Sequence, residues 1–196
     1  MKQALACALA LLGSVALLAA GPRTFTVEPD RSKAMIEVGK TGAFSFAGHT
    51  HEVEAPLTSG VVHLDPDNPS RADVRLEFNA AAMRVTGKGE SPDDVPKVTQ
   101  TMLSDMVLDV KKFPSITFES TSVGAKGDVA GKLTIHGTTR PITATVAWKV
   151  TGDTLTATGK FSIKQTDFGI KPISVGGVVK VKDELNITFT IAARER

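Results

Sequence analysis

Stretches in which apolar and polar residues alternate constrain this chain more than any other feature of its sequence. In residues 72–80, Val74, Leu76 and Phe78 fall on one face, and charged or amide residues fall on the other. A period of two is typical of a strand with one buried face. Four more such strands follow one another without an intervening helix, at 115–123, 128–136, 140–150 and 154–165. Strands joined by short turns pair antiparallel, so the sequence predicts an all-β, antiparallel sheet.

The number of strands indicates how this sheet is completed. Further strands are predicted at 24–28, 33–40, 60–64 and 184–193, with a Pro-Asp-Arg-Ser turn separating the first two. A sheet of so many one-sided strands would leave exposed edges unless it closes or doubles over. We therefore expect a closed up-and-down barrel, with a two-sheet sandwich as the alternative.

One segment interrupts the alternation. Between Gly87 and Lys112 the apolar residues recur at helical spacing, with Val98 and Met102 on one face. Ser91 is suited to the N-cap, and the proline that follows it is suited to the first helical position. The sequence predicts one short helix, at about residues 93–104, that acts as a lid over a barrel end or as a prop against the sheet.

The first twenty residues have the composition of a secretory signal peptide. Lys2 is followed by an apolar run from Ala4 to Ala20, rich in Ala and Leu, before the chain becomes polar. The run is short for a membrane anchor, which is the alternative. We expect cleavage after Ala20, so that residues 1–20 are the signal peptide and 21–196 form one domain. The protein is then periplasmic or secreted.

Cysteine content and charge exclude several classes of function. The only cysteine, Cys7, lies within the predicted signal peptide, so the remaining chain has no disulfide, no thiolate metal ligand and no cysteine nucleophile. The formal net charge is +2, and basic and acidic residues are interspersed along the chain. This pattern lacks the basic patch of a nucleic-acid-binding protein, and no nucleic acid is expected as a partner.

Three motifs in order resemble the YceI family of secreted bacterial lipid-binding proteins. They are Lys-Phe-Pro-Ser-Ile-Thr-Phe-Glu-Ser-Thr-Ser-Val at 112–123, Gly-Lys-Leu-Thr-Ile-His-Gly-Thr-Thr-Arg-Pro-Ile at 131–142 and Phe-Ser-Ile-Lys-Gln-Thr-Asp-Phe-Gly-Ile at 161–170. The resemblance implies a lipocalin-like barrel of eight strands whose apolar lumen holds a long isoprenoid chain in at least some members. The chain departs from better-known members in its first third, where it carries a Gly-His-x-His element at 48–51.

The apolar faces of the predicted strands supply a candidate lumen. A barrel core that is filled by its own side chains shows the same pattern as a hollow one, so a filled-core interaction module remains an alternative. Only the resemblance favours a ligand, namely an isoprenoid or other long-chain lipid, with transient membrane contact and the oligomeric state left open. The predicted ligand-binding lumen residues are Phe44, Phe46, Leu76, Phe78, Met102, Ile116, Phe118, Leu133, Ile135, Trp148, Phe161, Ile187 and Phe189.

Two histidines are the remaining candidates for chemistry. His49 and His51 are two residues apart and share one face of a strand. We interpret them as the polar rim of the lipid pocket. The alternative is a metal-dependent periplasmic enzyme or metal carrier, with a third ligand from His63, His136 or Glu54. No serine lies in a strained nucleophile elbow and no phosphate-binding loop precedes a helix, so no enzymatic activity, catalytic residue or cofactor is expected.

Overall fold

The computed structural model describes residues 21–41, 50–88, 90–124, 126–175 and 179–196. Twelve strands and one α-helix lie in this part of the chain. The helix is α1 (Val95–Leu103). The strands are β1 (Arg23–Val27), β2 (Lys33–Thr41), β3 (His51–Ala55), β4 (Leu57–Leu64), β5 (Asp73–Asn79), β6 (Arg84–Val85), β7 (Ser115–Val123), β8 (Asp128–Ile135), β9 (Thr138–Thr151), β10 (Thr154–Lys164), β11 (Ser174–Val175) and β12 (Val179–Glu195).

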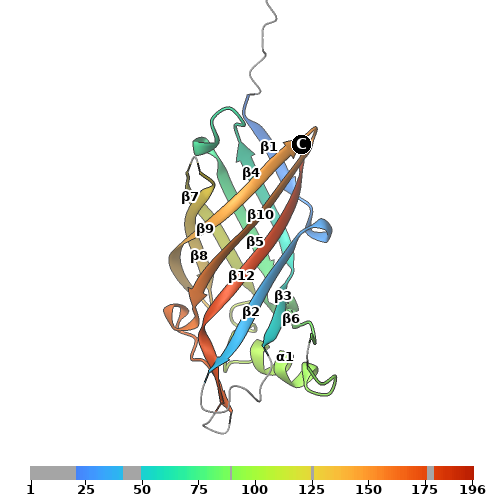
Figure 1. Ribbon diagram of the computed structural model, residues 1–196, viewed down its shortest axis with the longest axis vertical. Coiled ribbons are helices and arrows are strands. Elements are labelled where there is room, and N and C mark those ends of the chain that lie inside the picture. The colour runs from blue at the N-terminus through green and yellow to red at the C-terminus, as the bar shows by residue number, and fades with distance from the viewer. Residues whose placement is uncertain (1–20, 42–49, 89, 125, 176–178) are drawn as a thin grey trace, which may run out of the picture.

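The sheet closes into a barrel through β1. All the pairs are antiparallel, and the order is β1-β4-β5-β7-β8-β9-β10-β12. β1 then pairs with β12, with Phe25 opposite Glu195, and completes the ring. Figure 1 shows the long, tilted strands wrapping around a common axis. This pairing confirms the predicted antiparallel barrel of eight strands. Closure removes the edges that the separate strands would expose.

Three of the eight barrel strands are each broken into two pieces. β1 and β2 both pair with β12 and run in the same direction, with a single 3₁₀ turn (Pro29–Arg31) between them. β3 and β4 are likewise separated by Pro56, and β5 and β6 by a 3₁₀ turn (Ala80–Ala82). The turn expected at 29–32 is present, but the chain does not reverse there. β2, β3 and β6 extend the barrel at the end where α1 lies.

The helix α1 lies at that same end of the barrel (Figure 1) and contacts β6. It begins at Val95, with Asp94 as the N-cap residue and Pro96 in the first turn. The predicted N-cap, Ser91, instead accepts a hydrogen bond from the Asp94 amide at 2.9 Å within a preceding turn. The expected helix is therefore confirmed in place and shortened at both ends. No helix among the described residues is long and apolar enough to cross a membrane.

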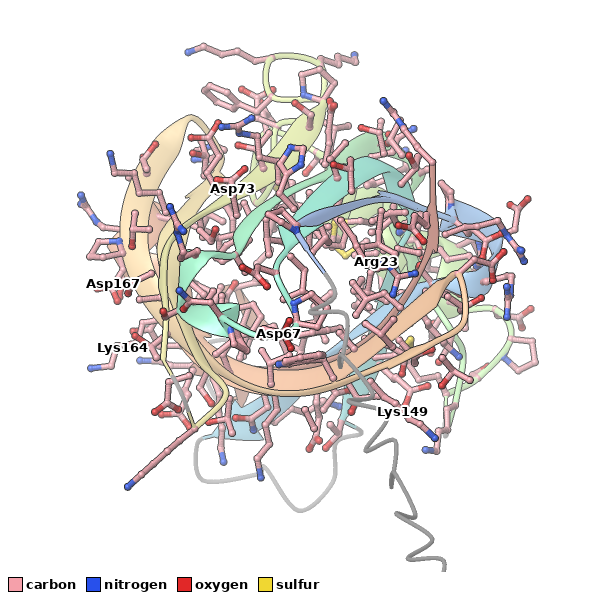
Figure 2. The ribbon with its side chains drawn as sticks, turned by 90° about the horizontal axis from the view of Figure 1, so that it is seen from above. Arg23, Asp67, Asp73, Lys149, Lys164 and Asp167 are labelled. Carbon is pink, nitrogen blue, oxygen red and sulfur yellow. The ribbon has the colours of Figure 1, made fainter. Side chains whose placement is uncertain are left out.

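The strand alternation produces one inner face around the whole ring. Apolar residues of the inner face are buried or half-buried, and polar residues of the same strands point to solvent. Figure 2, which looks along the barrel, shows charged side chains such as those of Lys164 and Asp167 on the outside of the ring. The β8–β9 hairpin turns through His136 and Gly137, with φ values of 52° and 71°. Two positive φ angles are typical of a tight hairpin turn, as expected for strands joined by short turns.

Candidate functional site: an apolar barrel lumen

The lumen contains a cavity of about 460 Å³. Its wall runs from Leu64 and Leu155 near one end of the barrel to Val98 and Met102 of α1 at the other. Small side chains on the inner face, among them Ala144 and Ala157, help to leave this space unfilled. The size falls in the range of about 300–1,000 Å³ that is typical of small-molecule sites.

Two glycines make room for aromatic rings within the wall. A Cβ atom on Gly159 would lie 2.4 Å from the Phe189 ring, and one on Gly131 would lie 2.4 Å from the Phe118 ring. Each ring therefore lies against bare backbone of a neighbouring strand. Because the glycines have no side chain, these rings can lie against the wall of the barrel.

One end of the barrel, hereafter the closed end, is where β1 begins and β12 ends. A cluster of buried side chains fills it: Phe25, Val27, Leu57, Val62, Leu64, Leu155, Ile191 and Ala193. Phe25 is fully buried. The Arg23 guanidinium lies 4.9 Å from the centre of the Phe25 ring, and its Nε donates to Glu195 Oε1 at 2.8 Å. This hydrogen bond is the main cause that lowers the pKa of Glu195. An ion pair thus covers the apolar plug.

The opposite end, hereafter the open end, is bordered by α1. Val98 and Met102 contribute to the cavity wall, and so does Lys97, whose side chain is 73% exposed. A residue that is both exposed and part of the wall marks a place where the cavity reaches the surface. β6 and β7 do not pair with each other. At this end α1 contacts β6 and contributes to the cavity wall.

Polar side chains in the wall are confined to the open end. They are His51, Lys97, Thr101 and Gln165; the rest of the wall is aliphatic or aromatic. His51 Nδ1 lies 2.5 Å from Glu90 Oε1, and only 4% of the Glu90 side chain is exposed. Gln165 donates through Nε2 to the Lys182 carbonyl at 2.8 Å. The cavity therefore has an apolar body and one polar end. This arrangement matches the apolar tail and polar head group of an amphiphile.

Lys40 adds a cation at the open end. It follows Ala34, Ile36 and Val38 at every second position of β2, and it pairs across the sheet with Val181, which lines the cavity. Lys40 therefore lies on the inner face of the barrel. Burial lowers the pKa of its ammonium group, and the carboxylate of Glu90 acts against that shift. The inner face thus ends in a partly desolvated positive charge.

Sequence comparison identifies the family of this barrel. A family model for the YceI-like domain matches residues 25–193, which is nearly the whole described barrel. The chain belongs to the YceI-like family. A UPF0312 protein of Pseudomonas aeruginosa (strain LESB58) is 32% identical over 121 residues, which are 57% of this chain and 59% of that protein. The protein YceI of Salmonella arizonae is 34% identical over 87 residues, 43% of this chain and 41% of that one. The chain thus spans less than two thirds of these relatives' length.

Solved structures of the YceI-like fold resemble this barrel over most of its length. BcnA of Burkholderia cenocepacia superposes with a TM-score of 0.67 at 22% identity and covers 85% of this chain and 98% of BcnA. A polyisoprenoid binding domain of Saccharophagus degradans superposes with a TM-score of 0.56 at 9% identity, covering 88% of this chain and 98% of that domain. At these identities the likeness concerns the fold.

The structure places most of the predicted lumen residues together in this YceI-like barrel. Eleven of them are described, and all eleven line the cavity; their role in binding stays a prediction. Phe44, Phe46 and His49 lie outside the described residues. His51 lies at the polar end of the wall, where a rim residue was expected. Five further polar residues at the open end were not predicted: Lys40, Glu90, Lys97, Thr101 and Gln165.

The strand alternation indicates where some of these residues lie. Gln165 continues the inner-facing series of Phe161 and Ile163, and Lys40 continues that of Ile36 and Val38. A polar residue that extends an apolar stripe by two positions is expected on the same face. The proximity of Glu90 to His51 has no such signal, because 39 residues separate them and the approach depends on how the α1 segment packs.

The three residues considered as further metal ligands are engaged elsewhere. His63 Nδ1 lies 3.0 Å from the Thr24 hydroxyl near the closed end. The His136 ring stacks edge-on against Phe113, with centroids 4.7 Å apart. Glu54 accepts a hydrogen bond from Arg84 at 2.7 Å. Within the described residues, no three His, Cys, Asp or Glu side chains gather into a group that could hold a metal ion.

Proposed function

We propose that this protein is a secreted or periplasmic carrier that holds an isoprenoid or other amphiphilic lipid in the barrel lumen and does not transform it. The observation that carries the proposal is the cavity of about 460 Å³ with an apolar body and a single polar end. The predicted signal peptide at residues 1–20 supports export. The polyisoprenoid binding domain of Saccharophagus degradans, which shares the fold, supports a lipid of this class.

The energetics of the cavity favour an occupant. An apolar chain that enters the lumen gains about 25 cal/mol per Å² of its own surface taken out of water.

The distribution of polar groups supports binding without chemistry. Over most of its length, the enclosed chain would contact only hydrocarbon and aromatic side chains. The titratable groups of the described wall lie at the open end, where His51 and Glu90 already bond to each other. Such a wall offers burial along the chain and hydrogen bonds at one end.

Dye displacement with a matched pair of variants tests this function. Protein stripped of lipid should bind the uncharged dye N-phenyl-1-naphthylamine with a blue-shifted emission, and farnesol should displace it. Ala157 lines the cavity and Thr158 points to solvent on the same strand. Ala157→Phe should fill the lumen and weaken dye binding at least tenfold, whereas Thr158→Phe should bind like the wild type. No dye binding by the wild type, or equal binding by Ala157→Phe, would contradict the proposal.

A further inference from the structure

Lys40, near the end of β2, is a cation on the inner face of the barrel that forms no ion pair with a described carboxylate. Lys97 pairs with Asp94 at 3.0 Å, Arg84 with Glu54 at 2.7 Å and Lys88 with Glu52 at 3.6 Å. No described carboxylate lies within 4 Å of the Lys40 ammonium group. The segments outside the described residues (1–20, 42–49, 89, 125 and 176–178) contain no Asp or Glu that could supply one.

The nearest negative charge at this end is already engaged. Glu90 holds His51 at 2.5 Å and is nearly inaccessible to solvent. Asp94 is likewise engaged by Lys97. Lys40 then remains as a cation at the end of an apolar cavity with no described carboxylate at ion-pair distance. Burial has already lowered the pKa of Lys40, and an anion beside it would offset that cost.

The closed end limits how a tail can lie in the cavity. The buried plug around Phe25 prevents the tail from extending through the closed end. A chain longer than the cavity would have to leave part of its length outside the open end of the barrel.

We propose that the lumen is built for a single-chain lipid anion, with its tail enclosed and its carboxylate or phosphate between Lys40 and His51. This inference rests on the proposed lipid-binding function and narrows it to a single chain and a head-group charge. The ammonium of Lys40 supplies charge-assisted hydrogen bonds to the anion. The apolar wall supplies most of the affinity.

A series of ligands of increasing chain length tests the enclosed tail and the anionic head group separately. Linear carboxylic acids of 10 to 22 carbons and the matching alcohols are titrated below their critical micelle concentrations. Binding is followed by the fluorescence of Trp148, which lines the cavity and is the only tryptophan of the chain. The Kd of the acids should fall about fourfold per added methylene until the cavity is full and then level off. The acid of each length should bind at least tenfold more tightly than its alcohol.

Two lysine variants test the role of the cation. Lys40→Met should abolish the preference for acid over alcohol and leave alcohol binding unchanged, and Lys40→Arg should retain the preference. Lys182 is the matched control, because its side chain lies over Gly39 in the adjacent strand on the outer face. Lys182→Met should behave like the wild type. An alkyl phosphate of the same length shows whether phosphate binds more tightly than carboxylate; tighter binding of either anion than of the alcohol supports the proposal.

Two results would overturn this inference while the lipid-binding function stands. They are equal affinity of acids and alcohols, and a preference for acids that survives Lys40→Met. Failure of every acid and alcohol to bind protein that also fails to bind the apolar dye would instead overturn the proposed function itself, and this inference with it.

Discussion

His51 Nδ1 lies 2.5 Å from Glu90 Oε1 and joins the first residue of β3 to the segment that precedes α1. Glu90 is almost completely buried, so its carboxylate depends on this partner. The contact fixes the helical segment against the barrel at the end where the cavity opens. It also sets the polar boundary of an otherwise apolar lumen.

Replacing His51 alone should destabilise the protein more than replacing both partners. His51→Ala leaves the buried Glu90 without its hydrogen bond, and such a loss costs about 1–3 kcal/mol of unfolding free energy. The double variant His51→Ala, Glu90→Leu removes both polar groups and should recover much of that loss. Urea denaturation of the three proteins measures the difference. A double variant no more stable than the single one would show that the contact is not the source of the effect.

Charges on the inner face of α1 should loosen ligand retention without unfolding the barrel. Val98 and Met102 line the cavity, and α1 contributes no strand to the ring. Val98→Asp, Met102→Asp should therefore speed release of a bound dye at least tenfold while the β-sheet circular dichroism stays unchanged. Gln100→Asp, on the exposed side of the same helix, is the control. Loss of the β-sheet signal would mean instead that α1 is part of the folding core.

The contact between Gly159 and the Phe189 ring should not tolerate a methyl group. In Gly159→Ala the new Cβ would lie 2.4 Å from the ring and 2.8 Å from the Thr145 carbonyl oxygen, so we expect a loss of about 1–3 kcal/mol. Phe189→Leu in the same protein removes the clash with the ring and should restore part of the stability. Chemical denaturation gives the four values of this cycle. Strict additivity of the two changes would rule out the ring as the clashing group.

Asp183 should make stability depend on pH in the acid range. Hydrogen bonds from the Thr166 hydroxyl, at 2.7 Å, and from the Thr166 amide lower the pKa of Asp183. A carboxylate whose folded pKa lies below its unfolded pKa stabilises the protein above the unfolded pKa, and this stabilisation is lost as the pH falls through the folded pKa. Asp183→Asn should therefore lower the Tm at pH 7, and the difference from the wild type should shrink towards pH 3. A constant difference at both pH values would exclude this linkage.

Sequence reasoning located the barrel because every long strand keeps its period of two, as at Val74, Leu76 and Phe78. It did not distinguish a reversing turn from a 3₁₀ interruption at 29–31, because Pro, Asp and Ser favour both. The inner face of each strand was predicted only as far as its last apolar residue. Lys40 and Gln165, which lie two positions further along the same faces, were therefore missed. The volume of the lumen was not predictable, because it depends on how side chains from eight strands pack together.

Native mass spectrometry tests the central claim most directly, since a hollow barrel and a filled one give different masses. The full-length protein is expressed in a bacterium, exported and purified without an affinity tag. We predict the mass of residues 21–196 plus one lipid, and loss of the added mass after extraction with organic solvent. The bare mass of the chain under the gentlest conditions, or a stoichiometric metal in place of a lipid, would contradict the account of this protein as a lipid carrier.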